Sequence, residues 1–312
     1  MATLPSMRQL RYLIAIGQQL NFTKAAEQCF VSQSTLSAGL KELEDGLGVQ
    51  LVERDRQNVS LTPMGKEVID RAKTLLASAE DMVEYAQSAF QKMAGTIRLG
   101  VIPTITPFVL PQILPELRSR YPDLKVALRE DLTANLLQKI HDHQLDFAII
   151  ALPYDTEGLL VKGLYGDEFW LAAKKNDPVL DGKEATVSAK MAERLLLLEE
   201  GHCLREHSLR ACRRSGLPNA SEFEATSLLT LVQMVESDLG IALLPEMAIR
   251  NGILKNTNLR AKPLSSPAPK RQIALVARQT TARIDEYMAI SKIMLDVNQE
   301  AQKKVYKLSK ND

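Results

Sequence analysis

The chain has 312 residues, of which 45% are hydrophobic and 25% are charged, and its formal net charge is +1. This composition is typical of a globular protein, and the length favours two or three compact units over a single core. A net charge near zero is no signature of nucleic-acid binding, so that function has to be argued from a motif. Three cysteines argue against an extracellular disulfide scaffold. No stretch approaches the roughly 20 apolar residues of a membrane span, so we expect a cytoplasmic protein with no membrane partner.

Three helices are predicted within residues 1–64. Apolar residues at helical spacing predict the first two, around residues 10–17 and 22–29, and the hydroxyl of Thr23 is a candidate cap for the second. Cys29 falls on the apolar face of that helix, so we interpret it as a small buried hydrophobe. Ser32 is a natural N-cap for a third helix, whose leucines repeat at intervals of four, three and four: Leu36, Leu40, Leu43 and Leu47.

The third helix carries polar side chains on its opposite side or at its exposed N-terminal end. They are Gln33, Ser34, Thr35, Ser37 and Lys41. Amides and hydroxyls of this kind reach base edges or phosphates, and a helix N-terminus favours a phosphate. Taken alone, such a helix is more often a solvated amphipathic one.

Two short strands are predicted at residues 46–54 and 59–62, on either side of a charged turn. A hairpin of this kind after a helix pair is typical of a DNA-binding wing. We therefore expect Arg54 and Arg56 to contact DNA. Thr23 and Ser32, at the starts of the second and third helices, are candidate DNA contacts as well.

Residues 65–95 carry an unbroken heptad pattern of apolar residues, which predicts one long linker helix. The pattern consists of Val68, Ala72, Leu75, Ala79, Met82, Ala86, Ala89 and Met93. The stripe either packs against its own domain or forms a dimer seam, and its end at Gly95 favours the dimer. A dimer would present two recognition helices to a roughly two-fold-symmetric site.

Residues 96–312 alternate between predicted strands and helices, which is typical of an α/β fold with a parallel sheet. The strands are expected at residues 96–101, 125–128, 147–151, 168–173, 195–198, 241–244 and 273–277, and the helices at 107–120, 135–141, 227–237 and 283–304. Two lobes are predicted, lobe I from residues 96–166 and 268–312 and lobe II from residues 167–267. Thr104 and Thr133 follow the first two strands, at the edge where such sheets bind ligands, although each hydroxyl could equally be a cap.

The order of these motifs resembles the LysR-type transcriptional regulators. The residues that carry the resemblance are Phe22-Thr23-Lys24-Ala25-Ala26, Val31-Ser32-Gln33, Thr35-Leu36-Ser37, Leu43-Glu44, Leu47-Gly48, Leu51-Val52-Glu53-Arg54 and Leu61-Thr62-Pro63-Met64-Gly65. The resemblance implies a winged helix-turn-helix in residues 1–64, a dimerising linker helix in residues 65–95 and a two-lobed regulatory domain of the type 2 periplasmic-binding-protein fold. Double-stranded promoter DNA is the implied partner. Ser34 departs from the family, which usually has proline there, so the start of the recognition helix is expected to be less rigid.

Two of the three cysteines, Cys203 and Cys212, lie nine positions apart, with His202 and Arg205 beside the first. A guanidinium charge favours a thiolate, and an imidazole can give or take a proton. An unreactive buried cysteine is an equally open reading. The residues offer no recognised set of metal ligands, so no metal or cofactor is expected. In a helix the two alpha carbons would lie about 13–14 Å apart, whereas a disulfide needs about 4.4–6.8 Å, so bonding would require unwinding.

A sharper resemblance, to the peroxide-sensing members of the LysR family, is carried by Gly201-His202-Cys203-Leu204-Arg205 with Cys212, by Ile102-Pro103-Thr104 and by Phe223-Glu224-Ala225-Thr226-Ser227-Leu228. It implies that Cys203 is the peroxidatic thiolate and Cys212 the resolving thiol. Thr104 and Thr133 would orient hydrogen peroxide. The activating groups would be His202, Arg205 and, at the edge of the pocket, Arg271.

The same resemblance implies how such a protein works. A sulfenic acid forms on the first cysteine and condenses to a disulfide, which cytosolic thiol reductants later reverse. The change rearranges a tetramer on DNA and alters its contacts with RNA polymerase, so that genes are activated or repressed.

Two alternatives remain. The chain could be a LysR-type regulator that senses an organic metabolite, with both cysteines not functional. It could also be a thiol peroxidase, although the helix pair and the heptad pattern favour a regulator, so we expect no enzyme.

Overall fold

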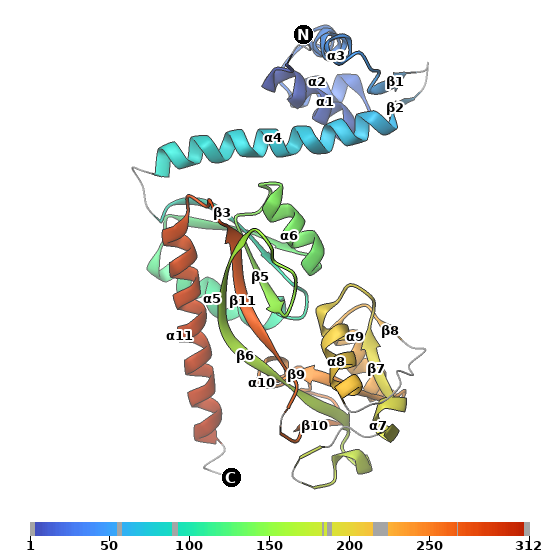
Figure 1. Cartoon of the computed structure of the whole chain (residues 1–312), viewed down its shortest axis with the longest axis vertical. Coiled ribbons are helices and arrows are strands. Elements are labelled where there is room, and N and C mark those ends of the chain that lie inside the picture. The colour runs from blue at the N-terminus through green and yellow to red at the C-terminus, as the bar shows by residue number, and fades with distance from the viewer. Residues whose placement is uncertain are drawn as a thin grey trace. The chain divides into compact units, whose positions relative to one another are not determined.

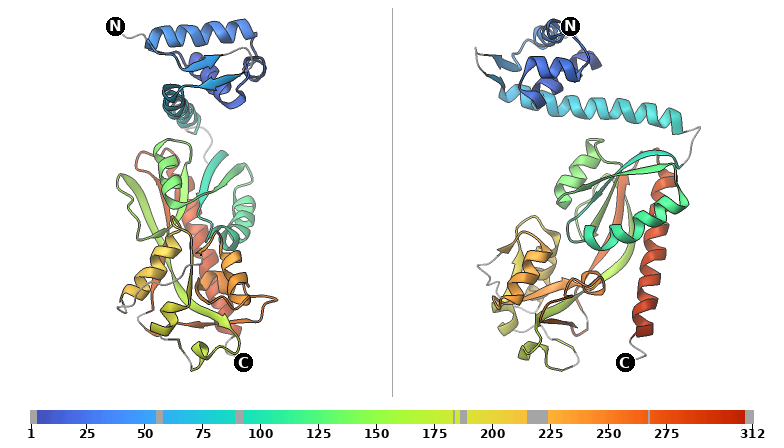
Figure 2. Two further views of the ribbon diagram at one scale, coloured as in Figure 1. Left: turned by 90° about the vertical axis from the view of Figure 1, so that its right-hand side faces the viewer. Right: turned by 180° about the vertical axis from the view of Figure 1, so that it is seen from behind.

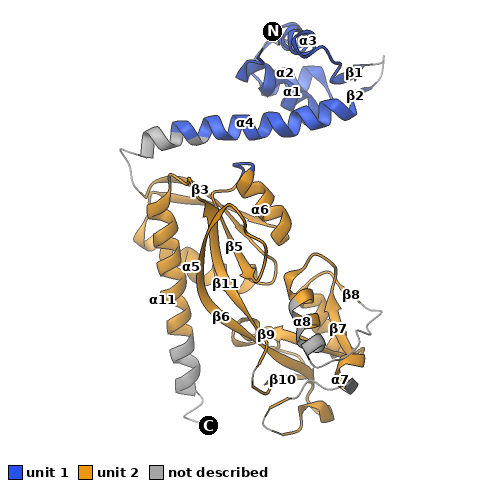
Figure 3. Cartoon of the chain, viewed as in Figure 1, with its two compact units in different colours: residues 1–89, 142–144 blue, residues 90–141, 145–312 orange. Residues whose placement is uncertain are grey.

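The computed structural model describes residues 4–54, 58–88, 93–182, 184–185, 189–214, 224–266 and 268–308. The chain divides into two compact units, which Figure 3 colours separately. Unit 1 comprises residues 1–89 with 142–144, and unit 2 comprises residues 90–141 with 145–312. Within the described ranges, no helix combines the length and the apolar character that a membrane crossing requires.

Unit 1 is a winged helix-turn-helix, as predicted. Its elements are α1 (Met7–Gln19), α2 (Phe22–Gln28), α3 (Gln33–Leu47), the antiparallel hairpin of β1 (Val52–Arg54) and β2 (Val59–Leu61), and α4 (Pro63–Ser88) (Figure 1). Leu13, Ile16, Leu36 and Leu40 are fully buried between the three short helices. Leu36, Leu40 and Leu43 of α3 face this core, whereas Leu47, the last leucine of the predicted stripe, is exposed. The opposite side of α3 and its first turn are exposed as well.

Two local predictions in unit 1 are wrong. Asn21, not Thr23, caps α2, because the Asn21 side chain accepts a hydrogen bond from the backbone N–H of Lys24 at 3.0 Å. The first wing strand does not begin at residue 46, since α3 continues to Leu47 and ends at Gly48 in the left-handed region. Only residues 52–54 form the strand.

The predicted apolar stripe of the linker helix divides between different surroundings. Val68 and Ala72 pack into the core of unit 1, and Met93 packs against the core of unit 2. Leu75 and Met82 on α4 are instead 51% and 67% exposed. Of the remaining predicted positions, Ala89 lies outside the described residues. Within the described part of the stripe, Leu75 and Met82 are therefore the large apolar residues that the predicted dimer seam leaves exposed.

Unit 2 contains one long sheet shared by two lobes, which confirms the predicted two-lobed α/β fold. Its strands are β3 (Gly95–Val101), β4 (Leu124–Glu130), β5 (Phe147–Leu152), β6 (Leu159–Lys174), β7 (Leu195–Leu198), β8 (Glu224–Ala225), β9 (Ile241–Pro245), β10 (Leu259–Pro263) and β11 (Lys270–Arg278). The order is β4-β3-β5-β11-β6-β9-β7-β8, and β10 also pairs with β6. The neighbours β4, β3 and β5 are parallel, as are β8, β7 and β9.

The long strand β6 joins the lobes, and Figure 2 shows it running from one into the other. Residues 159–168 of β6 pair with β11, whereas residues 169–174 pair with β9 and β10. Sequence analysis predicted only residues 168–173 as a strand, because the preceding segment alternates poorly between apolar and polar residues. The strands β8 and β10 were not predicted either.

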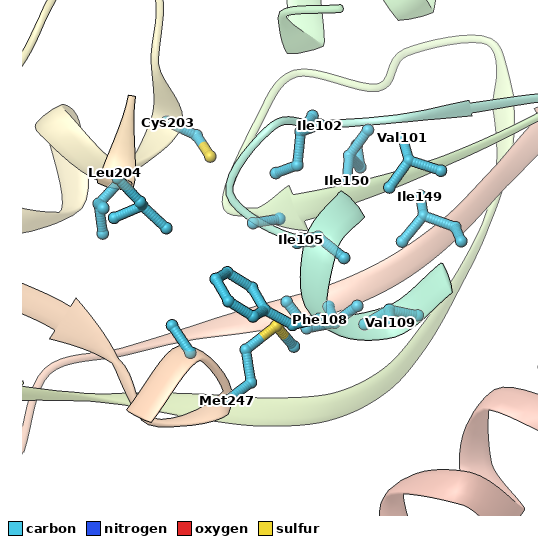
Figure 4. Close-up of a cluster of buried hydrophobic side chains, with 14 of the residues drawn as sticks. Val101, Ile102, Ile105, Phe108, Val109, Ile149, Ile150, Cys203, Leu204 and Met247 are labelled. Carbon is cyan, nitrogen blue, oxygen red and sulfur yellow. The ribbon is translucent and has the colours of Figure 1, made fainter. Parts of the chain in front are cut away.

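Helices cover both lobes. In lobe I they are α5 (Thr106–Arg120), α6 (Thr133–His141) and α11 (Ile284–Leu308), and in lobe II the 3-10 helix η1 (Pro178–Leu180), α7 (Ala189–Glu193), α8 (Cys203–Arg214), α9 (Leu228–Glu236) and α10 (Glu246–Arg250). The two cores are continuous through side chains such as Ile102, Phe108 and Met247, which Figure 4 shows around the junction of the lobes. The ends of β3 and β4 and the starts of α6 and α8 all lie at this junction.

Candidate functional site

Cys203 is the first residue of α8, and its side chain is buried where lobe II meets lobe I. Figure 4 shows its sulfur turned toward the loop of lobe I that carries Ile102. This position at a helix N-terminus favours negative charge on the sulfur, since the backbone N–H of Leu204 bonds to it. The thiol therefore belongs to lobe II, whereas the side chains that it faces belong to lobe I.

Thr104 and Arg271 are the side chains of lobe I that contact this thiol. Arg271 Nη1 donates a hydrogen bond to Oγ1 of Thr104 at 2.7 Å, and Nη2 donates to the Thr104 carbonyl oxygen at 3.3 Å. Because Oγ1 accepts from the guanidinium, its own proton is available to be donated to the sulfur of Cys203. Sulfur, hydroxyl and guanidinium form a buried row across the junction.

Asp167 on β6 extends this row behind Arg271. Its Oδ2 accepts a hydrogen bond from Arg271 Nε at 3.0 Å and lies 2.9 Å from Nη2, while its Oδ1 accepts from the backbone N–H of Met247 at 2.9 Å. The side chain of Arg271 is 0% exposed and that of Asp167 is 1% exposed. Asp167 was not predicted from the sequence, since no local motif relates it to Arg271, which is 104 positions away.

Burial raises the pKa of the Cys203 thiol above its ordinary value. The charge of Arg271 and the hydrogen bonds from Thr104, Arg271 and Leu204 pull the pKa the other way, but they do not outweigh the loss of solvent. At neutral pH the resting side chain is therefore mainly a protonated thiol.

His202 precedes α8 and is half-buried. Burial lowers the pKa of its imidazole, although the carboxylates of Glu199 and Glu130 act in the opposite direction. A histidine in this state is mainly neutral near pH 7 and can accept a proton.

Arg205 does not stand where sequence analysis expected it, beside the thiol. Its Nη1 donates to the carbonyl oxygen of Leu198 at 2.9 Å and pairs with Glu224 Oε1 at 2.5 Å. These contacts hold the edge strands β7 and β8 of lobe II. The charge that reaches the sulfur comes from Arg271 instead.

Thr133 is the first residue of α6 and is 1% exposed. Among the described residues, its hydroxyl has no hydrogen-bond partner. The loop before Cys203 lies against the same segment, since a Cβ on Gly201 would stand 2.9 Å from Leu132 Cδ1, and Gly201 has a φ of +93°. A buried hydroxyl left unpaired costs about 1–3 kcal/mol, so a small polar ligand bound beside it would recover hydrogen bonding.

Cys212 lies on the same helix as Cys203, and its side chain is outside the described residues. Nine residues of continuous α-helix separate the two alpha carbons by about 13–14 Å. A disulfide between them therefore requires α8 to unwind. Cys29, in unit 1, is partly buried, which raises the pKa of its thiol.

In unit 1, α3 carries most of the predicted DNA-contacting residues. Ser32 caps the helix by accepting a hydrogen bond from the N–H of Thr35 at 3.1 Å. The first turn and the outer face expose Gln33, Ser34, Thr35 and Lys41. Ser37 is placed differently from the prediction, because its hydroxyl oxygen is buried and so faces away from a ligand on the outer face.

The remaining predicted contacts lie around α3. Thr23 is exposed on α2, and the guanidinium of Arg54 stacks 3.9 Å above the ring of Phe22. Arg56 lies outside the described residues. Phe30 was not predicted from the sequence as a DNA contact, and it is 95% exposed in the turn between α2 and α3. An exposed aromatic residue beside a recognition helix is suited to contact a thymine methyl group or a sugar.

A cavity of about 660 Å³ lies in unit 2 beside the start of β11. It is lined by Leu152, Pro153, Tyr154, Thr156, Gly166, Lys270, Arg271 and Gln272. Its volume is in the range of sites for small organic molecules. Within the described part of the chain, no three His, Cys, Asp or Glu side chains gather as metal ligands.

Comparison with known proteins gives the same division of the chain. Residues 7–66 match the family described as "Bacterial regulatory helix-turn-helix protein, lysR family", and residues 90–287 match "LysR substrate binding domain". The HTH-type transcriptional regulator EstR of Acinetobacter baylyi is 43% identical over 94% of this chain and 97% of its own length. The hydrogen peroxide-inducible genes activator of Haemophilus influenzae is 35% identical over 93% of this chain and 96% of its own.

Solved structures resemble the chain as well. A mutant OxyR of Corynebacterium glutamicum with hydrogen peroxide bound has a TM-score of 0.65 and 32% identity, and the match covers 96% of this chain and 95% of that one.

Proposed function

Because the chain belongs to the lysR family of bacterial helix-turn-helix regulators, we propose that it is a peroxide-responsive transcriptional regulator whose trigger is Cys203. The observation that carries the proposal is the buried row of Cys203, Thr104 and Arg271, together with the Thr133 hydroxyl, which has no partner in the part of the chain that the structure describes. A peroxide molecule between them would gain donors and acceptors on both oxygens. Two relatives of the chain, the activator of Haemophilus influenzae and the OxyR of Corynebacterium glutamicum, are described in terms of hydrogen peroxide.

The reaction follows from these groups. The thiol of Cys203 gives up its proton, for which neutral His202 is an acceptor nearby in the chain, and the thiolate attacks one peroxide oxygen. The O–O bond breaks, an S–O bond forms, and the second oxygen leaves with a proton as water. Donation from Thr104 and the charge of Arg271 stabilise the negative sulfur during attack.

The sulfenic acid is then resolved by Cys212. Its thiol attacks the sulfur of Cys203, an S–S bond forms and a second water leaves. Since α8 must unwind to bring the two sulfurs together, oxidation changes the fold of lobe II. Cellular thiol reductants would reverse the bond, which fits a protein that works in the reducing cytoplasm. Peroxide is here a signal and not a substrate to be cleared, so the protein is not an enzyme.

The output is a change in promoter binding. We assign the exposed Gln33, Ser34, Thr35 and Lys41 of α3 to contacts with double-stranded DNA, with Thr23, Arg54 and Phe30 beside them. Arg56 is assigned to the same role from the sequence alone. Exposed Leu75 and Met82 on α4 support a dimer through the linker helix, and a tetramer would carry the change in lobe II to RNA polymerase.

The test is a peptide map under non-reducing conditions after brief exposure to peroxide. A linked pair of peptides containing Cys203 and Cys212 is expected, and Cys203→Ser is expected to abolish peroxide-dependent promoter switching. Cys29→Ser is the matched control and should switch normally. Normal switching by Cys203→Ser would contradict the proposal.

The cavity of about 660 Å³ supports a second candidate, a regulator that senses a small organic molecule. The name of EstR, the relative at 43% identity, does not mention peroxide. In that case ligand binding would protect the cavity-lining Lys270 from amine modification, and substitution of Cys203 would leave switching intact.

A further inference from the structure

Arg271 lies between two acidic groups rather than one. The Cys203 thiol reaches it from the side of α8, and the Asp167 carboxylate pairs with it at 2.9–3.0 Å from β6. Arg271 and Asp167 face each other directly in the antiparallel ladder of β11 and β6, so the backbone fixes their pairing. The guanidinium is therefore compensated even when the sulfur is protonated.

This compensation restrains the thiol. A fully unpaired guanidinium at hydrogen-bond distance would strongly favour a thiolate. Because Asp167 already balances the charge, the sulfur gains less from Arg271. The carboxylate thus makes the resting cysteine less reactive than its cationic neighbour alone would make it.

The same pair matters after oxidation. When Cys203 moves to join Cys212, it leaves a guanidinium that is 0% exposed. Without Asp167 that charge would keep only the two oxygens of Thr104, and an unpaired buried charge is strongly destabilising. With Asp167 the ion pair stays complete after the sulfur has gone.

We propose that Asp167 is the positioning residue that keeps Arg271 in charge balance in both redox states, so that it lowers the reactivity of reduced Cys203 and prolongs the life of the oxidised form. The proposal rests on the proposed function, since it assigns a regulator to the same site. It makes Asp167 the residue that sets how much peroxide the protein tolerates before it responds.

Other charged groups near Asp167 do not replace it. Glu246 on α10 lies near enough to repel it, but Glu246 is paired with Arg250, with Nε and Oε1 3.5 Å apart. The hydroxyl of Tyr165 is neutral, since burial raises the pKa of that phenol well above its usual range. Removing the charge at position 167 therefore leaves Arg271 as the uncompensated group.

The experiment uses the full chain with Cys29→Ser and Cys212→Ser, so that Cys203 is the only thiol. Asp167→Asn keeps the shape and an oxygen for the Met247 N–H but removes the charge. The rate of Cys203 alkylation by iodoacetamide at pH 7 is expected to rise about tenfold, and its pH profile to move to lower pH. Glu168→Gln is the matched control, since Glu168 is the next carboxylate on β6 and is exposed. An unchanged profile in a folded Asp167→Asn protein overturns the proposal.

Lifetime is measured in the chain that keeps Cys203 and Cys212. After complete oxidation, Asp167→Asn is expected to be reduced by dithiothreitol about tenfold faster than the parent, because its oxidised form contains an unpaired guanidinium. Reduction at the parental rate would overturn this half of the proposal. Alkylation needs no peroxide, so failure of Cys203 to oxidise would count against the proposed function and not against the restraint by Asp167.

A variant pair covers the case in which Asp167→Asn does not fold. Arg271→Gln removes the cation, and Asp167→Asn should then have no further effect on the alkylation profile, since it acts only through Arg271. Equal profiles for Arg271→Gln and for the double variant support the proposal. A shift between them shows that Asp167 acts by another route and overturns it.

Discussion

Glu44 on α3 is expected to hold the wing in place. Its Oε1 accepts hydrogen bonds from the backbone N–H groups of Leu51 at 2.7 Å and Val52 at 3.0 Å, at the start of β1. Hydrogen bonds to a charged acceptor contribute about 1.5–3 kcal/mol each. Because Glu44 is half-buried, the lower end applies, and Glu44→Ala should destabilise this segment by about 3 kcal/mol.

Hydrogen exchange measured by mass spectrometry on the full chain would detect this loss. A change of about 3 kcal/mol raises the exchange rate of amides that open with the wing by about a hundredfold. Operator affinity should fall in parallel, since Arg54 on β1 loses its fixed position. The chain has a single tryptophan, Trp170 in β6 of unit 2, so its fluorescence transition should not move.

Glu42→Ala is the matched control, because Glu42 lies on the same helix but is exposed and, among the described residues, accepts only a hydrogen bond from Gln9 Nε2 at 3.2 Å. Exposed substitutions of this kind change stability by about 0.5 kcal/mol or less. If Glu44→Ala and Glu42→Ala gave the same exchange rates and the same operator affinity, the carboxylate would not be what anchors β1.

Three further predictions concern the cysteine site. Thr133→Val should leave thermal stability unchanged or raise it, because the hydroxyl has no partner among the described residues. It should slow oxidation by peroxide about fivefold, because one hydrogen bond of about 1 kcal/mol is lost. Oxidation at the parental rate in stopped-flow measurements would remove Thr133 from the peroxide site. Arg205→Met should lower the free energy of unfolding, since the hydrogen bond to Leu198 is lost, but it should not change the pH profile of Cys203 alkylation. A shifted profile would show that Arg205 is an activating group after all. Because burial raises the pKa of Cys203, the alkylation rate should keep rising at alkaline pH beyond the pH at which the rate for Cys203 in a denatured chain levels off. The raised pKa also means that this thiol's contribution to stability is present below the pKa of the unfolded chain and is lost as pH rises through the pKa of the folded protein.

Sequence reasoning succeeded where a pattern is local. The four leucines of β7 were predicted with the bounds that the structure gives them, since all four are buried and no alternation is needed. The start of α3 followed from a serine cap and a regular leucine spacing. The strand β10 has the sequence Leu-Arg-Ala-Lys-Pro, which has no apolar run, and it is a strand only because β6 offers an edge to pair with.

In the cysteine site, too, the features that depend on a local pattern were the predictable ones. Thr104, Thr133 and Cys203 each stand at the end of a strand or the start of a helix, which a sequence can indicate. Spacing along the chain favours Arg205 as the cation beside the thiol, but Arg205 pairs with Glu224, whereas Arg271, which the family resemblance implied, reaches the thiol from β11. The partner of Arg271 is defined only by the register of β11 against β6.

The continuity of β6 limits how the two lobes can move. A slip by one residue against β11 or β9 would turn every inward side chain outward, and Phe169 and Leu171 would leave a core in which they are 1% and 0% exposed. The lobes therefore cannot slide along β6. They can move only by twisting or bending of β6 near residues 168 and 169, where its hydrogen-bonding partners change. The unwinding of α8 that we propose would therefore reach lobe I as a rotation.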